Sequence, residues 1–248
     1  MTEHKYNWKK DKPDPRDWRY CRNFTAPRIT PKTVNLRAYC SPIEDQGNMG
    51  SCTGNALAGA LEFLEIKAKT PYVDLSRLFI YYNERILDGS VNEDSGAYLR
   101  DGIKTLAKQG VCSESTWPYL ESNLFLKPTN TAYNEAKQRM IKSYYRLNGL
   151  ADFKNCLASG YPFVFGFLVY ESFESNYVAK TGIVPMPKKR EMLLGGHAVL
   201  AVGYSDNTQR FLIRNSWGID WGYGGYFYLP YQYLANRNLA SDFWTIRK

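Results

Sequence analysis

The sequence has very little histidine and no long apolar run. His4 and His197 are the only histidines among 248 residues, so a multi-histidine metal site cannot be assembled. The longest uncharged apolar run, residues 161–170, has about half the length that a membrane-spanning helix needs. The first thirty residues also hold no apolar block of the kind that a secretory signal carries. We therefore expect no metal, no membrane contact and no export signal.

Paired or closely spaced cysteines are also missing. The five cysteines are an odd number with wide and irregular spacing, and none of them forms a CxxC motif. A disulfide framework would need an even set, and a tetrahedral zinc site would need closely spaced ligands. The cysteine pattern therefore indicates neither kind of site.

Excess positive charge is confined to one end of the chain. The net charge is +8, but residues 1–37 hold ten Lys and Arg against four Asp and Glu, which leaves +2 for the rest. Beyond that segment, no basic run alternates with aromatic residues that could stack on bases. We therefore expect no nucleic-acid partner.

The apolar pattern places helices before strands. Leu57, Ala60, Leu61 and Leu64 recur at helical spacing and predict one buried face on a helix over residues 52–69. Further helices are predicted over residues 76–87 and 96–109, and strands rich in Val, Ile, Phe and Tyr over residues 163–170, 197–204, 210–215 and 225–229. This order predicts an α+β fold with a helical lobe and a sheet lobe.

Cys52 lies at the first turn of the predicted long helix. Unpaired N–H groups and the helix dipole favour the nucleophilic thiolate there. Gly47 and Gly50 let the backbone approach a substrate closely. Gln46 supplies an amide that could face the oxygen of a tetrahedral intermediate, together with the Cys52 backbone N–H. The alternative is that Cys52 only fills space at the start of the helix.

A thiolate nucleophile needs a base, and the sequence offers one strong candidate. His197, in a Gly-Gly-His-Ala segment, is predicted at the start of a strand. Asn215 ends the next predicted strand and carries an amide that can accept a hydrogen bond from the imidazole. Each residue alone has a structural explanation, but the combination favours nucleophilic catalysis.

These segments resemble the papain-like cysteine peptidases. The Gln46…Cys52, Gly-His197-Ala and Asn215-Ser-Trp-Gly motifs occur in the order found in that family. The resemblance extends through Leu75-Ser76, Trp117-Pro-Tyr119 and Trp221-Gly-Tyr-Gly-Gly-Tyr226, so that it spans roughly residues 36–248. It implies a two-lobe fold, a helical lobe plus an antiparallel barrel-like sheet lobe, with the active-site cleft between them.

The resemblance also implies roles for individual residues. Cys52 would be the nucleophile, His197 the base that forms a thiolate–imidazolium pair with it, and Asn215 the residue that orients His197. Gln46 would line the oxyanion hole. The remaining substrate-binding candidates are Trp217, which would shield the His–Asn contact, Gly96, whose backbone would pair with an extended substrate, and Ser95, Ala198, Ser241 and Asp242. No cofactor is implied.

Two departures from the family pattern affect these expectations. Met49 replaces a cysteine that is normally disulfide-bonded, and Thr53 replaces an aromatic residue. The lost bridge favours a reducing compartment, such as cytoplasm or a virion, over secretion. Two alternatives remain for the residue at the floor of the specificity pocket. Ser241 there would favour apolar side chains, whereas Asp242 would favour Lys or Arg.

The N-terminal extension, residues 1–35, is expected to be a short propeptide that lies in the cleft. Its prolines favour extended chain, although a permanent strap that stabilises the sheet lobe is the alternative. Residues 36–248 would form the peptidase domain, with a helical lobe over about 36–125 and a sheet lobe over about 126–240. The predicted function is an autoinhibited cysteine endopeptidase. The rivals are a thiol acyltransferase or deubiquitinase-like enzyme with the same triad, and an inactive peptide-binding relative.

Overall fold

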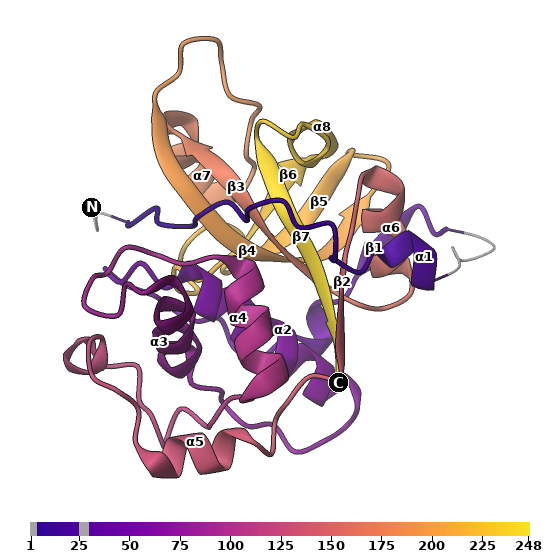
Figure 1. The fold of residues 1–248 in the computed structure, drawn as a ribbon. Coiled ribbons are helices and arrows are strands. Elements are labelled where there is room, and N and C mark those ends of the chain that lie inside the picture. The colour runs from indigo at the N-terminus through magenta and orange to yellow at the C-terminus, as the bar shows by residue number, and fades with distance from the viewer. Residues whose placement is uncertain (1–3, 25–29) are drawn as a thin grey trace.

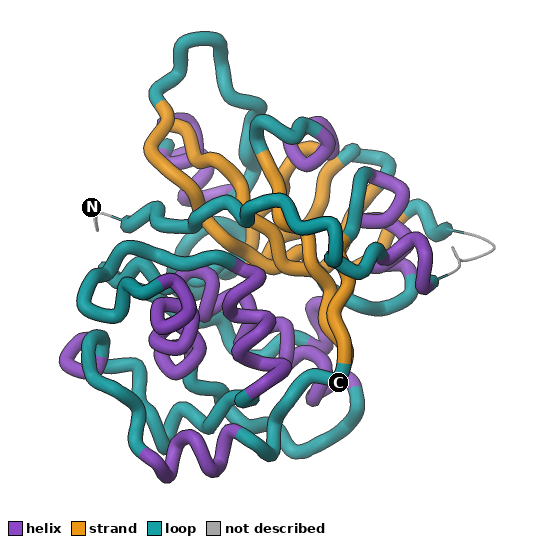
Figure 2. The backbone as a smooth tube through the Cα atoms, in the orientation of Figure 1, coloured by secondary structure: helices purple, strands orange, loops and turns teal. Residues whose placement is uncertain are grey.

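Helices pack against one antiparallel sheet in the computed structural model, which describes residues 4–24 and 30–248 (Figures 1 and 2). Residues 1–3 and 25–29 of the predicted extension lie outside the described residues. The helices are α1 (Tyr20–Asn23), α2 (Cys52–Lys67), α3 (Arg77–Asp88), α4 (Leu99–Lys108), α5 (Asn130–Ala136), α6 (Leu150–Ala158), α7 (Asn176–Thr181) and α8 (Tyr231–Ala235). Short 3-10 turns lie at Arg37–Tyr39, Glu121–Asn123 and Glu171–Glu174. No helix in this part of the chain is long and apolar enough to cross a membrane.

The strands form a sheet in the order β2-β7-β3-β4-β5-β6, and β1 pairs with β4 beside this path. They are β1 (Thr33–Asn35), β2 (Ser143–Arg146), β3 (Phe163–Tyr170), β4 (Leu193–Ser205), β5 (Arg210–Arg214), β6 (Tyr226–Pro230) and β7 (Ala240–Arg247). All of these pairings are antiparallel. The prediction of an α+β fold is confirmed. In Figure 1, α5 lies with the helices, and the Ser113 N–H donates to the Glu135 carboxylate of α5 at 2.8 Å.

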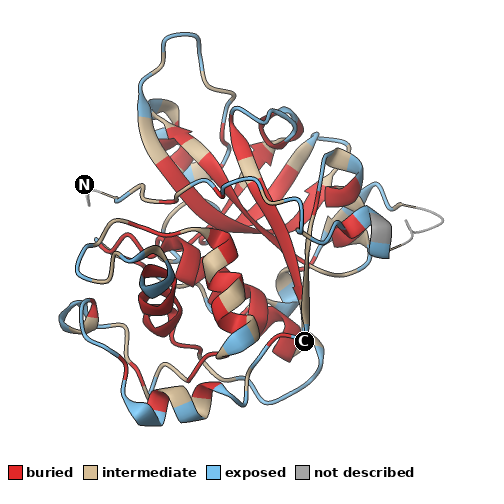
Figure 3. Ribbon diagram, viewed as in Figure 1, coloured by how far each residue is buried: buried red, intermediate tan, exposed pale blue. Residues whose placement is uncertain are grey.

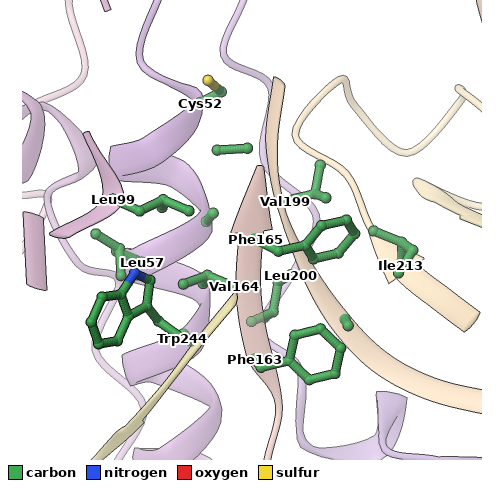
Figure 4. Close-up of a cluster of buried hydrophobic side chains, with 14 of the residues drawn as sticks. Cys52, Leu57, Leu99, Phe163, Val164, Phe165, Val199, Leu200, Ile213 and Trp244 are labelled. Carbon is green, nitrogen blue, oxygen red and sulfur yellow. The ribbon is translucent and has the colours of Figure 1, made fainter. Parts of the chain in front are cut away.

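The prediction of a single buried face on α2 is wrong. Every residue from Cys52 to Glu65 is buried, including the polar ones, and α2 is surrounded by α3, α4 and β4 (Figure 3). In the core close-up, Leu57 lies beside Trp244 of β7 and Val164 of β3 (Figure 4). A helix that is enclosed on all sides has no solvent face, so the apolar spacing marks only part of its contacts.

The start of α4 differs from the predicted start at Gly96. Residues 96–98 are not helical: Gly96 has a φ of 77°, Tyr98 is extended, and Leu99 is the first helical residue. The predicted bounds of α3 agree better, because Ser76 caps its N-terminus by accepting from the Phe79 N–H. The segment before α4 thus stays available for backbone pairing.

Two other local predictions are corrected by contacts distant in sequence. His197 lies inside β4, which begins at Leu193, because the Gly195-Gly196 pair continues the ladder opposite β3. In the extension, residues 20–23 form α1 although the proline-rich pattern predicts no helix. Tyr20 is buried, and Phe24 directly after the turn packs edge-on against Tyr145 of β2 with ring centroids 4.8 Å apart, so tertiary packing stabilises this turn.

Gly102 of α4 offers a test of the helical packing. A Cβ atom there would lie 2.1 Å from Glu84 Oε1 and 2.3 Å from Leu57 Cδ1. We expect Gly102→Ala to lower the free energy of unfolding by about 1–2 kcal/mol, because overpacking outweighs a helix-propensity gain of roughly 1 kcal/mol. The urea midpoint measures the change. Lys104→Ala on the same helix should shift it little, and an unchanged midpoint for Gly102→Ala would contradict this packing.

Candidate active site

Cys52 is the first residue of α2, and its side chain is 1% exposed. The N-terminal end of the helix favours negative charge on the sulfur. Backbone N–H groups of Ala198 and Thr53 also act on the thiol and lower its pKa, against the larger effect of burial. Ala198 directly follows His197, the candidate base, in β4, and α2 packs against this strand.

His197 is oriented by Asn215. Its Nε2 atom lies 2.8 Å from Asn215 Oδ1, an amide oxygen that can only accept a hydrogen bond. The neutral ring therefore carries its proton on Nε2 and leaves the lone pair on Nδ1. Nδ1 is buried and has no hydrogen-bond partner among the described residues. β5, which ends at Arg214, pairs with β4, and this pairing brings Asn215 to the ring.

Gln46 is fully buried and held at both ends of its amide. Its Oε1 accepts from the Ser216 hydroxyl at 2.7 Å, and its Nε2 donates to the Met49 carbonyl at 3.1 Å. The amide N–H₂ group thus faces the loop that precedes Cys52. Sequence reasoning missed Ser216, although this residue lies inside the Asn-Ser-Trp motif.

A sequence profile described as the papain family cysteine protease matches residues 30–243. The chain belongs to the papain family of cysteine proteases. This protease is 50% identical over 227 residues to an uncharacterized peptidase C1-like protein of Acanthamoeba polyphaga mimivirus, covering 88% of this chain and 73% of that protein. The structure of xylellain, a cysteine protease from Xylella fastidiosa, matches with a TM-score of 0.90 and 43% identity over 98% of this chain and 96% of the other.

More distant relatives are longer proteins. Cysteine proteinase 3 of Entamoeba histolytica is 29% identical over 210 residues, and this chain spans 64% of its length. The matched xylellain structure confirms the papain-like α+β fold, a helical region plus an antiparallel sheet. The protein is therefore a papain-family cysteine peptidase, which is a hydrolase.

In this papain-family protease, aromatic rings cover the His197–Asn215 contact. The Trp217 ring stacks on the imidazole with centroids 5.1 Å apart. Two residues of the extension complete the cover: His4 stacks on Trp217 at 3.8 Å, and the Tyr6 ring meets His197 edge-on at 6.3 Å. Solvent is thereby excluded from the imidazole, which is 0% exposed.

Asp94 connects the loop before Cys52 to the loop that holds Gly96. Its carboxylate accepts from the Gly50 N–H at 3.0 Å and from the Tyr81 hydroxyl at 2.7 Å. The Tyr81 oxygen in turn accepts from the Gly96 N–H at 3.0 Å. Sequence reasoning missed Asp94, although it stands two residues before Gly96.

The substrate-binding candidates Gly96 and Ser95 contact the extension. A Cβ atom on Gly96 would lie 1.6 Å from the Asn7 carbonyl oxygen, so only glycine allows this approach. The Ser95 hydroxyl accepts from Lys9 Nζ at 3.1 Å, and the Lys9 N–H donates to the Ala97 carbonyl at 3.0 Å. This backbone contact is part of a parallel bridge between Lys9 and Tyr98.

Ser241 and Asp242, the two candidates for the floor of the specificity pocket, have different neighbours. Ser241 of β7 lies opposite Gly166 of β3, and Gly166 lies opposite Ala198 of β4. Asp242 has a φ of 59°, and its carboxylate accepts from the Asp11 N–H at 2.7 Å and pairs with Arg146 at 2.7 Å. Ser241 and Ala198 therefore share one row across the sheet, whereas Asp242 is committed to the extension and to Arg146.

Thr53, which departs from the family pattern, forms a buried pair with Glu84. The Thr53 hydroxyl donates to Glu84 Oε2 at 2.6 Å. Burial raises the pKa of Glu84 to about 8, so this carboxyl is mostly protonated at neutral pH. An aromatic side chain after Cys52 would displace this pair.

Burial also keeps the candidate catalytic pair neutral. It raises the pKa of the Cys52 thiol to about 12 and lowers the pKa of His197 to about 4, although the Asn215 hydrogen bond acts in the opposite direction on the imidazole. Between these two values the thiol keeps its proton and the imidazole is neutral, with its one proton on Nε2. The thiolate, which is the reactive form, is thus scarce while the site is covered.

Alkylation of the full chain by iodoacetamide tests this charge state. At pH 7 we expect Cys21, which is exposed, to be labelled quickly and Cys52 to be labelled slowly. The labelling rate of Cys52 should then rise steadily with pH and level off only near pH 12, because the thiolate fraction grows until the pKa is reached. Peptide mass mapping of samples taken at successive times measures both rates. Equal rates for the two cysteines at pH 7 would contradict the covered, neutral thiol.

Proposed function

We propose that the protein is a cysteine endopeptidase whose nucleophile is Cys52 and whose base is His197. The observation that carries this assignment is the 2.8 Å contact between His197 Nε2 and Asn215, which leaves the Nδ1 lone pair to receive the thiol proton. The thiolate attacks the peptide carbonyl, and the resulting imidazolium gives its proton to the departing amine. Water, deprotonated by His197, then hydrolyses the acyl-enzyme and frees the Cys52 sulfur.

Gln46 and the Cys52 backbone are the proposed oxyanion hole. The Gln46 amide is held by Ser216 and Met49, so its orientation requires no rearrangement when negative charge develops on the substrate oxygen. Trp217 stacks on the imidazole and keeps water from competing for the Asn215 contact. Ser241, in one row with Gly166 and Ala198, is the proposed floor of the specificity pocket.

Substitution of the proposed pair tests the mechanism. Cys52→Ala and His197→Ala should each reduce hydrolysis of a fluorogenic peptide to background, whereas Asn215→Ala should reduce kcat less, because orienting a base contributes less than being one. Cys21→Ser is the matched control for cysteine loss, since Cys21 is exposed. Full activity of His197→Ala would exclude this mechanism. Faster turnover of isopeptide than of peptide substrates would favour a deubiquitinase-like activity instead.

We further propose that the extension inhibits the peptidase in cis. Its backbone bonds to both halves of the site: the Trp8 N–H donates to the Gly196 carbonyl at 2.9 Å, and the Lys9 N–H donates to the Ala97 carbonyl at 3.0 Å. Figure 1 shows this N-terminal trace running between the helices and the sheet. A substrate that pairs with the backbone beside His197 would compete for the same groups.

Trp8 is the main apolar anchor of the extension. It is 8% exposed, and Cβ atoms on Gly166 or Gly196 would lie 1.9 Å and 2.7 Å from its ring. Tethering adds to this contact, because a covalently attached segment has an effective concentration on the order of millimolar. The extension therefore needs only modest intrinsic affinity to exclude substrates.

Two tryptophan substitutions separate inhibition from general stabilisation. Trp8→Ala should raise turnover of a fluorogenic peptide about tenfold or more, because loss of a buried aromatic ring weakens docking by several kcal/mol. Trp18→Ala is the matched control, since this ring is 62% exposed. Turnover and thermal midpoint are measured together on the full chain. Unchanged turnover with a large fall in the midpoint for Trp8→Ala would instead indicate a structural strap.

A further inference from the structure

Two arginines flank one tryptophan at a distance from the candidate catalytic pair. Arg100 of α4 and Arg146 of β2 place their guanidinium carbons 5.7 Å and 5.0 Å from the centre of the Trp244 ring. The Arg100 side chain is only 9% exposed and that of Arg146 is 26% exposed. These three residues, from the helical region and from the sheet, are called the arginine site below.

Carboxylates of the extension fill the arginine site. Asp17 pairs with Arg100 at 2.7 Å and with Arg146 at 3.0 Å. The Asp11 carboxylate, which is 0% exposed, accepts from Trp244 Nε1 at 2.9 Å and from the Arg100 N–H at 3.3 Å. Arg100 also donates to the Lys12 carbonyl at 2.6 Å. The extension therefore supplies acceptors for both Arg100 Nη atoms, for Arg146 Nη1 and for Trp244 Nε1.

The charge balance shows what the site needs when the extension is absent. Without it, two guanidiniums face the single carboxylate of Asp242, which pairs with Arg146 at 2.7 Å and leaves one net positive charge. With it, three carboxylates face two guanidiniums, and burial together with the Asp11 charge raises the pKa of Asp242 to about 7. One carboxylate added to Asp242 would therefore balance the charge of the two guanidiniums better than two added carboxylates or none.

An empty arginine site presents charged donors without acceptors. Arg100 would lose its Asp17 and Lys12 acceptors and Arg146 would lose Asp17, and a charged donor gains more from a charged acceptor than from a neutral one. A ligand that supplies a carboxylate at this place recovers that loss. A neutral amide, which offers only a weaker acceptor, recovers less of it.

The arginine site lies within reach of a peptide that occupies the active site. Asp11 lies three positions after Trp8, whose N–H donates to the Gly196 carbonyl beside His197. In extended chain that separation corresponds to about 10 Å. A bound substrate of ordinary length therefore spans both places.

We propose that Arg100, Arg146 and Trp244 form a second recognition site that binds the carboxylate of an acidic peptide substrate after the extension has left. The protease then favours substrates with one Asp or Glu three or four residues from the residue that pairs with Gly196. This inference rests on the proposed function, because it requires that substrates replace residues 4–24 of the extension.

Pairs of quenched fluorescent peptides test the proposal on the full chain. Each pair carries Asp or Asn at one position, and the position is moved from three to five residues on either side of the scissile bond. We expect the Asp peptide to have about tenfold higher kcat/KM at the favoured position, as for a charge-assisted hydrogen bond. The ratio within a pair is independent of how much enzyme is open, because both peptides use the same open fraction.

Arginine variants separate the site from general electrostatics. Arg100→Gln should raise turnover of both peptides by loosening the extension, yet bring the Asp-to-Asn ratio close to one. Lys104→Gln is the matched control, because it removes a positive charge from the same helix and should keep the ratio. Arg146→Gln supplies a second variant in case Arg100→Gln does not fold, as judged by its thermal midpoint.

The outcomes are distinguishable. An Asp-to-Asn ratio near one at every position in the unmodified chain, or a ratio that Arg100→Gln and Arg146→Gln leave unchanged, would overturn the arginine site. An equal loss of the ratio in Lys104→Gln would assign it to overall charge and would also overturn the proposal. Failure to cleave any peptide, or cleavage that survives Cys52→Ala, would overturn the proposed function instead.

Discussion

The structure depends on the packing of α2 against β4. Cys52 stands at the start of α2 and His197, 145 residues later, lies inside β4, so this packing brings together the two elements that carry the proposed nucleophile and base. Every residue from Cys52 to Glu65 is therefore enclosed, at the cost of burying polar groups that need partners. Thr53 is one of them, and its partner is Glu84 of α3, whose raised pKa reduces the charge that must be buried.

The burial that encloses the candidate pair also favours its neutral form. Removal of water raises the pKa of Cys52 and lowers that of His197, so the neutral forms of both are favoured. Much of the cover over the imidazole comes from His4 and Tyr6, which belong to the extension. Departure of these rings would readmit solvent and move both pKa values toward each other. Access and charge state are thus controlled by the same contacts.

The sequence predicted the features that depend on residues close to one another in the chain. The bounds of α3 follow from the Ser76 cap and from Gly89, which has a φ of 74°, and β3 follows from its run of Phe and Val. The order of the motifs likewise predicted the candidate site residues. The sequence did not predict how far inside β4 His197 lies or that α4 starts at Leu99, because both depend on backbone pairing between distant segments. Asp94, Ser216 and the arginine site depend on such contacts as well.

The charge of the extension does not explain its docking. Residues 1–35 carry a net +5 and the remaining residues carry +3, so the two parts repel each other at long range. The contacts at short range have the opposite character: Asp11 and Asp17 enter the arginine site, while Lys5 pairs with Asp94 at 2.7 Å. Docking therefore depends on a few matched and partly buried pairs together with Trp8. Loss of those pairs would leave only Trp8 and the backbone hydrogen bonds to oppose this repulsion, so the docking of the extension would weaken.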